Sequence, residues 1–252
     1  MSTRAAAIRY HAGMTAADTA ITTADVMLAT ERGQTFNAYL ARTGSGRAPG
    51  VVVLSDMFGL NDPIRAVADR CAERGFAALV PNLFWRSEIS GAIPYDQDRH
   101  PAAWARLNAV DLDVVCRDIG AAVGWLRAQP FSSGKVAAIG FCGGGRWAYL
   151  AAARCNVAAA AALYGLGISR HLDELNNVKC PLQLHYGLKD QHIPRQEIDA
   201  VADGVKGRRS AEVFVYPDAG HSFANPVRPT YDAAAAKLAW SRIDAMLEGL
   251  RA

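Results

Sequence analysis

The sequence predicts an α/β fold in which a mostly parallel, twisted sheet carries helices on both faces. Short apolar runs alternate with longer helix-like runs, which is typical of strands joined by crossover helices. At residues 136–150 a strand-like run leads through a glycine-rich turn into a helix-like run. Because 252 residues suffice for one large core, we expect residues 1–252 to form a single domain, with residues 1–20 as an N-terminal extension.

The expected strands are short runs rich in Val, Ile, Leu and Ala, bounded by glycine, proline or polar residues. In chain order they lie at residues 24–42 (two strands separated by a turn at 31–33), 51–54, 76–80, 136–139, 157–164, 182–186 and 212–216. Chemistry in such sheets gathers at the carboxyl ends of the strands. Side chains just beyond these runs are therefore the first candidates for a site.

The expected helices repeat apolar residues every three or four positions. They lie at residues 61–75, 112–126, 146–150 and 231–250. Asn61 or Asp62 is expected to cap the first helix, with Pro63 in its first turn and Gly75 at its end. Residues 84–104 combine aromatic and charged side chains without periodicity, so we expect a long surface excursion there.

Composition excludes several classes of function. Hydrophobic residues make up 51% of the chain, the net charge is +3, and Lys and Arg are scattered, so neither a nucleic-acid interface nor a membrane-binding face is expected. The N-terminus lacks a signal-peptide core, and no apolar run approaches the roughly 18 residues of a spanning helix, which favours a cytoplasmic protein. We expect a monomer that acts on a small molecule without a cofactor.

The five cysteines are odd in number and include no C-x-x-C pair, so we expect reduced thiols and no metal site. Cys71, Cys116 and Cys155 lie on or near apolar helix faces, where a thiol packs as a small hydrophobe. Cys142 differs from these three because it lies in a distinct motif.

The segment Gly140-Phe-Cys142-Gly-Gly-Gly145 matches G-x-nucleophile-x-G, the sharp turn that presents a nucleophile between a strand and a helix. The turn strains its central residue, and neighbours larger than glycine would collide with the strand and the helix. Cys142 would thus lie at the tip of the sheet, beside the positive end of a helix dipole. The alternative is a glycine-rich connection beside an inert buried cysteine.

A cysteine nucleophile requires a base, because a free thiol is only a few per cent thiolate near neutral pH. His221 follows the last expected strand, and Asp190 follows the strand before it. The order Cys142, Asp190, His221 is that of nucleophile, acid and histidine in α/β-hydrolase triads. The imidazole would take the thiol proton, and the carboxylate would orient the imidazole and stabilise its charged form. Either residue alone would more often be structural, but three suitable residues at strand ends in this order rarely occur by chance.

Over roughly residues 20–250 the chain resembles the dienelactone hydrolase family of α/β-hydrolases. The resemblance rests on motifs in register: Asp56-Met-Phe-Gly-Leu-Asn61, Gly140-Phe-Cys-Gly-Gly-Gly145, Tyr164-Gly165, His185-x-Gly-x-x-Asp190 and Gly220-His-Ser-Phe-Ala224. It implies a carboxymethylenebutenolidase-like hydrolase of small cyclic enol-lactones, typically converting dienelactone to maleylacetate in the breakdown of aromatic compounds. An acyl-thioester intermediate and no cofactor are implied.

Carried over by position, the resemblance assigns the family's triad to Cys142, Asp190 and His221. The family's oxyanion hole consists of two backbone N–H groups, which fall on Met57 and Gly143. Such donors stabilise the negative charge that develops on the carbonyl oxygen.

Two positions depart from the family pattern. Family members usually carry glutamate at the position of Asp56, where the carboxylate contacts the resting thiol. The shorter aspartate either controls the thiol at a different geometry, or controls it less, or is a turn or capping residue. The family's first substrate-binding arginine falls on Arg86, which could instead be a solvated loop residue, but the second falls on Asn225. Arg228, three residues further on, is the candidate replacement.

Further substrate contacts are expected from side chains beside these positions. They are Trp85, Tyr164, Ser222 and Phe223. The rings of Trp85, Tyr164 and Phe223 would suit a flat substrate, although core packing explains any one of them equally well.

Three rival functions stay open. A broader carboxylesterase or thioesterase would use the same scaffold, and a non-catalytic small-molecule-binding protein would keep the fold. A metal hydrolase would use His185, Asp190 and His192. However, His185 lies within a strand run and is expected to be a core histidine, and His192 is expected to be a surface loop residue.

Overall fold

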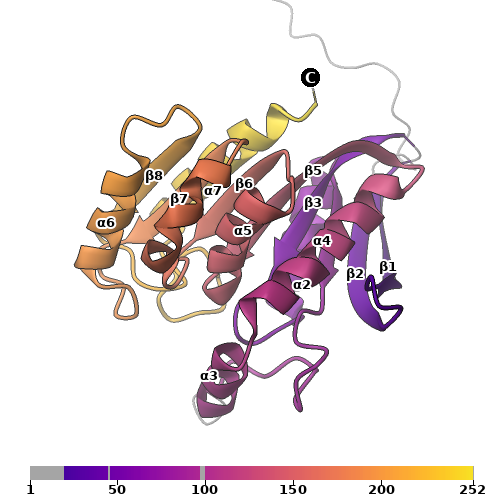
Figure 1. The fold of residues 1–252 in the computed structure, drawn as a ribbon, viewed down its shortest axis with the longest axis horizontal. Helices are drawn as coiled ribbons and strands as arrows, with labels where there is room; N and C mark the ends of the chain where they lie inside the picture. The colour runs from indigo at the N-terminus through magenta and orange to yellow at the C-terminus, as the bar shows by residue number, and fades with distance from the viewer. Residues whose placement is uncertain (1–19, 45, 97–99, 252) are drawn as a thin grey trace, which may run out of the picture.

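The architecture is a computed structural model that describes residues 20–44, 46–96 and 100–251. These residues form one eight-stranded sheet in the order β1-β2-β4-β3-β5-β6-β7-β8 (Figure 1). The strands are β1 (Ile21–Ala29), β2 (Thr35–Thr43), β3 (Ala48–Leu54), β4 (Ala77–Pro81), β5 (Ser132–Phe141), β6 (Ala159–Leu163), β7 (Leu182–Gly187) and β8 (Ala211–Tyr216). The helices are α2 (Asp62–Glu73), α3 (His100–Asn108), α4 (Leu112–Ala128), α5 (Gly143–Arg154), η2 (Ile168–Asn177, a 3-10 helix), α6 (Arg195–Val205) and α7 (Ala233–Glu248).

The sheet is mostly parallel, which confirms the predicted fold class. β1 and β2 form an antiparallel hairpin, and β2 pairs antiparallel with β4. Every other neighbouring pair is parallel. The expected N-terminal extension lies, except for Ala20, outside the described residues.

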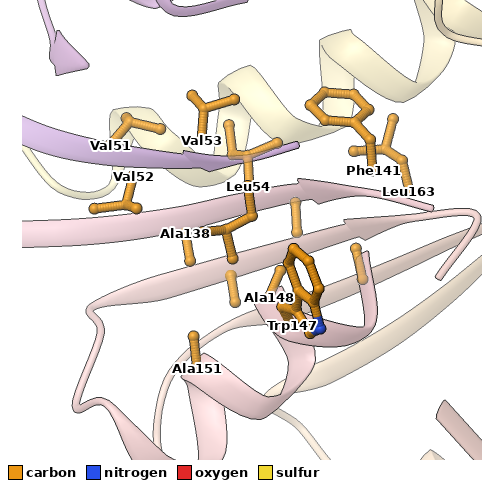
Figure 2. Packing of buried hydrophobic residues seen from close by; sticks show 14 of the residues in the cluster. Val51, Val52, Val53, Leu54, Ala138, Phe141, Trp147, Ala148, Ala151 and Leu163 are labelled. Carbon is orange, nitrogen blue, oxygen red and sulfur yellow. The ribbon is translucent and has the colours of Figure 1, made fainter. Parts of the chain in front are cut away.

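Alternating side chains bury both faces of the central strands. Figure 2 shows Val51 and Val53 on one side of β3 and Val52 on the other, where Trp147 and Ala148 of α5 lie. All five side chains are fully buried. Burial on both faces explains why β3 reads as a continuous apolar run and not as an alternating one.

The first helix begins as the sequence predicts. Asn61 is the N-cap of α2, its side chain accepts a hydrogen bond from the Ile64 N–H at 3.2 Å, and Pro63 lies in the first turn. The cap fixes the start of α2, so a short turn separates the helix from β3. That turn becomes part of the candidate site below.

Three helical segments depart from the sequence-based expectations. α3 occupies part of residues 84–104, which were expected to be irregular. It buries only Ala103, Arg106 and Leu107, so its apolar repeat is too weak to stand out in the sequence. No expectation covered η2 or α6, and neither helix has a side-chain hydrogen bond at its N-cap.

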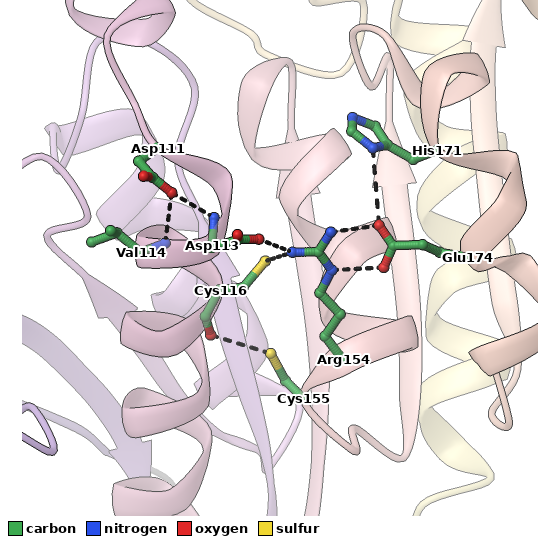
Figure 3. Close-up of polar contacts among 8 residues, drawn as sticks. All are labelled: Asp111, Asp113, Val114, Cys116, Arg154, Cys155, His171 and Glu174. Carbon is green, nitrogen blue, oxygen red and sulfur yellow. Dashed lines mark hydrogen bonds and ion pairs between the residues drawn. The ribbon is translucent and has the colours of Figure 1, made fainter.

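An ionic cluster on the surface connects α4, α5 and η2 (Figure 3). Arg154 at the end of α5 donates to both oxygens of Glu174 at 2.6 and 2.5 Å and to Asp113 at 2.8 Å. Beside it, the Cys155 thiol donates to the Cys116 carbonyl at 3.4 Å, and all five cysteines are free.

Within the described part of the chain, no helix has the length and apolar character needed to cross a membrane.

Candidate active site

Cys142 lies at the junction between β5, which ends at Phe141, and α5, which begins at Gly143. Its backbone has a φ of 57° and a ψ of −119°, a strained combination for a residue with a side chain. The strand–turn–helix geometry predicted for residues 136–150 is therefore confirmed. The thiol projects from the carboxyl end of a central strand, at the N-terminus of a helix.

The glycines around Cys142 are required by close backbone packing. A Cβ added at Gly140 would overlap the Gly144 carbonyl group, and one added at Gly144 would overlap the carbonyl oxygen of Leu54. A Cβ at Gly145 would lie 2.7 Å from the Cα of Gly165 in the next loop. α5 can therefore approach β3 and β6 closely only because these positions lack side chains.

His221 and Asp190 follow β8 and β7, two strands that pair with each other. The His221 Nδ1 atom lies 2.7 Å from Asp190 Oδ2. Asp190 Oδ1 accepts hydrogen bonds from the His192 and Ile193 N–H groups at 2.8 and 3.1 Å, which orient the carboxylate. The His221 side chain is 12% exposed and that of Asp190 only 1%. This enclosure strengthens the electrostatic interaction between them.

Cys142 lies close enough to His221 to influence the protonation of its imidazole. Nε2 is buried and has no well-formed hydrogen bond within the described chain. Burial lowers the pKa of His221, but the charge of Cys142 and the hydrogen bond with Asp190 outweigh it and raise the pKa to about 10. The structure thus brings the thiol, the imidazole and the carboxylate together and favours the charged imidazolium.

Met57 and Gly143 are also brought together at the ends of adjacent strands. β3 and β5 are neighbours with Leu54 opposite Gly140, so the segments that follow them lie side by side. The hydrogen bonds of the turn after β3 are donated by the residues after Met57, and the Met57 N–H is not among these donors. The Met57 carbonyl accepts a hydrogen bond from Arg106 Nη2 at 2.6 Å, which anchors the turn.

Asp56 is buried, but the structure gives its carboxylate partners other than the thiol. Oδ1 accepts a hydrogen bond from the Phe58 N–H at 2.9 Å, and Oδ2 accepts one from the Tyr95 hydroxyl at 2.8 Å. The Tyr95 hydroxyl in turn accepts a hydrogen bond from Asn225 Nδ2 at 3.1 Å. Burial raises the pKa of Asp56, and these hydrogen bonds partly offset the effect.

Arg86 and Trp85 are engaged with Asp118 of α4, and their expected contact with substrate stays a prediction. Arg86 forms an ion pair with Asp118 of α4, and its guanidinium lies 3.8 Å from the centre of the Trp85 ring. Trp85 Nε1 donates to the same carboxylate at 2.9 Å, and its ring stacks on Phe36. Asp118 is 2% exposed, and a buried carboxylate requires hydrogen-bond and ionic partners. Arg86 and Trp85 therefore stabilise the buried Asp118.

Aromatic side chains line the histidine side of the site. The Tyr164 ring lies 5.1 Å from the His221 ring and 5.4 Å from the Phe223 ring. Phe223 is fully buried and also packs on Tyr216, so it supports Tyr164 from behind. Ser222 adjoins His221 and has a φ of 63°. Tyr164 and Ser222 therefore lie beside the histidine, but both are buried, as is Phe223, and the expected contact of these side chains with substrate stays a prediction.

Arg228 provides a cationic group near Asp56. Its guanidinium lies 5.1 Å from the Tyr95 ring centre and 5.4 Å from that of Phe58, and its Nε atom is buried without a partner in the described structure. Arg228 also lowers the pKa of Asp56 through its charge. Sequence reasoning raised Arg228 as a replacement for the missing arginine but did not identify Tyr95, which lies in the aperiodic excursion and belongs to no motif.

The two histidines of the rival metal site, His185 and His192, have different surroundings. His185 is fully buried in β7, where its ring nitrogens pair with the Tyr216 hydroxyl at 2.9 Å and with Gln183 at 3.2 Å, as expected of a core histidine. His192 is exposed, yet its ring lies 4.8 Å from that of His221 and 5.4 Å from that of Trp104. Among the described residues, no group of three or more His, Cys, Asp or Glu side chains is placed to hold a metal ion.

The sheet order, the strained turn at Cys142 and the placement of side chains at the carboxyl ends of the strands define an α/β-hydrolase. The sequence profile of the dienelactone hydrolase family matches residues 36–250. The chain therefore belongs to the dienelactone hydrolase family and is a hydrolase of that family.

Individual relatives agree with this assignment. The carboxymethylenebutenolidase of Pseudomonas putida is 33% identical over 211 residues, which cover 83% of this chain and 89% of the relative. Carboxymethylenebutenolidase 1 of Cupriavidus pinatubonensis is 29% identical over 90% of this chain and 97% of the relative. A crystal structure of a proposed dienelactone hydrolase from Klebsiella pneumoniae superposes with a TM-score of 0.82 at 27% identity, covering 91% of this chain and 99% of that chain.

Proposed function

We propose that the protein is a cysteine hydrolase that opens small cyclic enol-lactones of the dienelactone type. The observation that carries the proposal is the placement of Cys142 on a strained strand-to-helix turn beside a His221 whose other nitrogen lies 2.7 Å from Asp190. The carboxymethylenebutenolidase relatives at about one-third identity support this substrate class. Cytoplasmic action in the breakdown of aromatic compounds is the corresponding biological role.

The proposed reaction begins with attack of the Cys142 thiolate on the lactone carbonyl carbon, which forms a C–S bond and a tetrahedral oxyanion. The Met57 and Gly143 N–H groups stabilise that oxyanion. Collapse breaks the ring C–O bond and expels an enolate, which takes up a proton from His221 Nε2. His221 then removes a proton from water, and the resulting hydroxide attacks the thioester. The C–S bond breaks, the product leaves as the carboxylic acid and loses its proton to solvent, and Cys142 is restored as thiolate beside the protonated His221.

Recognition of the substrate carboxylate is assigned to Arg228. Its Nε atom is an unpartnered buried donor, and arginine binds carboxylates through such planar N–H groups. Arg86 is engaged by Asp118, so a single arginine would serve the site. This favours a second candidate, a carboxylesterase of broader range, because one cation discriminates less strongly for a carboxylate than two.

Turnover of cis- and trans-dienelactone by the wild type and by Cys142→Ala tests the proposal. Loss of the nucleophile should lower kcat by about 10⁴-fold or more. Cys155→Ala, which removes the thiol that donates to the Cys116 carbonyl, is the matched control and should keep the wild-type rate. Equal turnover by Cys142→Ala and the wild type would refute the proposed nucleophile. A higher kcat/KM for p-nitrophenyl acetate than for either dienelactone would instead favour the broader esterase.

A further inference from the structure

The charge of His221 acts on the buried Asp56 carboxylate, and Asp56 and Cys142 both act on Tyr164, but both Asp56 oxygens are engaged by other groups. The Phe58 N–H donates to Oδ1 at 2.9 Å, and the Tyr95 hydroxyl donates to Oδ2 at 2.8 Å. A buried carboxylate held by a donor on each oxygen cannot turn toward another group without leaving those donors unsatisfied. We propose that Tyr95 is a positioning residue that holds Asp56 away from Cys142, so that the thiolate–imidazolium pair forms before substrate binds.

Tyr95 is itself held in place on three sides. Its single hydroxyl proton is used on Asp56, and its oxygen accepts a hydrogen bond from Asn225 Nδ2 at 3.1 Å. Its ring packs edge-on against Phe58 with centroids 4.6 Å apart, and the Arg228 guanidinium lies over the same ring. These contacts join the excursion after β4 to the loops that carry the triad, and they restrict the rotamers available to Tyr95.

The position of Asp56 matters because a carboxylate in contact with sulfur opposes thiolate formation. It accepts the S–H proton as a hydrogen bond and repels the negative charge of the thiolate. The other titratable groups that interact with Asp56 are Arg228, Arg106 and His221, which are cationic when charged, and the buried hydroxyl of Tyr164. With the carboxylate held by Tyr95, the three cationic groups and the helix dipole at α5 favour the thiolate.

The alkylation rate of Cys142 by iodoacetamide, followed by mass spectrometry across pH, measures the thiolate directly and requires no lactone. In Tyr95→Phe the carboxylate is free to approach the sulfur, so alkylation near pH 7 should slow by about tenfold and the pH profile should move up by about one unit. Asn225→Ala removes the donor to Tyr95 and should slow alkylation in the same direction by about threefold. Adding Asp56→Asn to Tyr95→Phe should restore the rate to within about twofold of the wild type, because the neutral amide cannot repel the thiolate.

Tyr39→Phe is the matched control, since the Tyr39 hydroxyl donates to Asp69 at 2.7 Å in another part of the fold, and it should leave the rate unchanged. Wild-type labelling rates in Tyr95→Phe would overturn the proposal, as would slow labelling that Asp56→Asn does not restore. The proposal rests on Cys142 as the nucleophile. If Cys142 of the wild type is alkylated no faster than the partly exposed Cys155, the proposed function fails, whereas failure in Tyr95→Phe alone removes only the role of Tyr95.

Discussion

Backbone strain in this protein is concentrated around the candidate site. Four described non-glycine residues have a positive φ, and three of them are Cys142, Tyr164 and Ser222. The fourth, Asn156, is of a residue type that tolerates this conformation. Strained residues persist only where the surrounding packing determines them, and they recur at active sites. The close contacts of Gly140, Gly144 and Gly145 with neighbouring backbone supply that packing here.

Gly144→Ala tests how tightly the turn around Cys142 is packed. The added methyl group would overlap the carbonyl oxygens of Leu54 and Ser55, which are backbone atoms of β3 and its turn and cannot move independently. We expect a loss of about 3 kcal/mol in the free energy of unfolding, measured by urea denaturation. Gly124→Ala, in α4 with open space around the new methyl, is the matched control and should stabilise the protein by about 0.5–1 kcal/mol. Equal effects of the two substitutions would contradict the packing argument.

Arg228→Gln tests the proposed carboxylate site. Removing the guanidinium should raise KM for dienelactone by about tenfold, while KM for the uncharged p-nitrophenyl acetate should change by less than about twofold. Steady-state kinetics with both substrates measure this difference. Arg65→Gln is the control, because Arg65 also lies over a tyrosine ring, 4.6 Å from that of Tyr39. A parallel rise in KM for both substrates would argue against a carboxylate contact.

At the scale of elements, α3 connects the excursion after β4 to the proposed oxyanion turn. Arg106 of α3 donates to the carbonyls of Ile89, Gly91 and Met57 at 2.9, 2.6 and 2.6 Å, and its guanidinium lies 4.0 Å from the Phe84 ring centre. Three carbonyls accept hydrogen bonds from the two Nη atoms of a cation that is only 5% exposed, while its Nε has no hydrogen-bond partner among the described residues. α3 thus holds the turn that contains Met57 in place through the Arg106 side chain.

The ionic cluster on α5 should make stability depend on pH. The hydrogen bonds from Arg154 lower the pKa of Glu174 below its ordinary value of 4.5. A carboxyl whose pKa is lower in the folded state stabilises the fold fully above about pH 4.5, and this contribution is lost as the pH falls through the lowered value. Glu174→Gln should therefore destabilise the protein by about 1 kcal/mol at pH 7 and by less at pH 3.

Thermal or urea unfolding at the two pH values checks the dependence on Glu174. The matched control is Asp199→Asn, which breaks the more exposed Arg195–Asp199 pair at 2.7 Å within α6. Its effect should be near zero at both pH values, because water and salt screen exposed pairs. An equal loss from Glu174→Gln at pH 7 and pH 3 would show that the effect is not ionic.

At the scale of the whole molecule, the sequence predicted what local pattern determines. Neighbouring residues determine the strand runs, the helix cap at Asn61 and the sharp turn at Cys142. They also determine the positions of His221 and Asp190 at strand ends. Contacts between distant segments could not be predicted in this way. The hydrogen bond from Tyr95 to Asp56 joins residues 39 positions apart, and the partner of Arg86 proved to be a buried carboxylate on a later helix.

The single domain expected for the chain is itself open to test, because Asp244 joins the last described helix, α7, to α2 in the first third of the chain. Asp244 of α7 accepts two hydrogen bonds from Arg70 of α2 at 3.0 and 2.8 Å, and Arg74 lies 2.9 Å from the same carboxylate. The side chain is 13% exposed, so the pair is poorly screened. Asp244→Asn keeps the shape but removes the charge and should cost about 2 kcal/mol.

In a single cooperative domain, Asp244→Asn should lower the urea midpoint equally by tryptophan fluorescence and by far-UV circular dichroism, with an unchanged slope. Asp25→Asn is the control, because Asp25 and Arg65 form an exposed pair at 3.4 Å, and the midpoint should stay at the wild-type value. Two separate transitions, or a shift seen by one probe only, would mean that α2 and α7 unfold apart from the rest of the sheet. Coincident shifts would mean that α2, α7 and the loops carrying Cys142 and His221 belong to one cooperative unit.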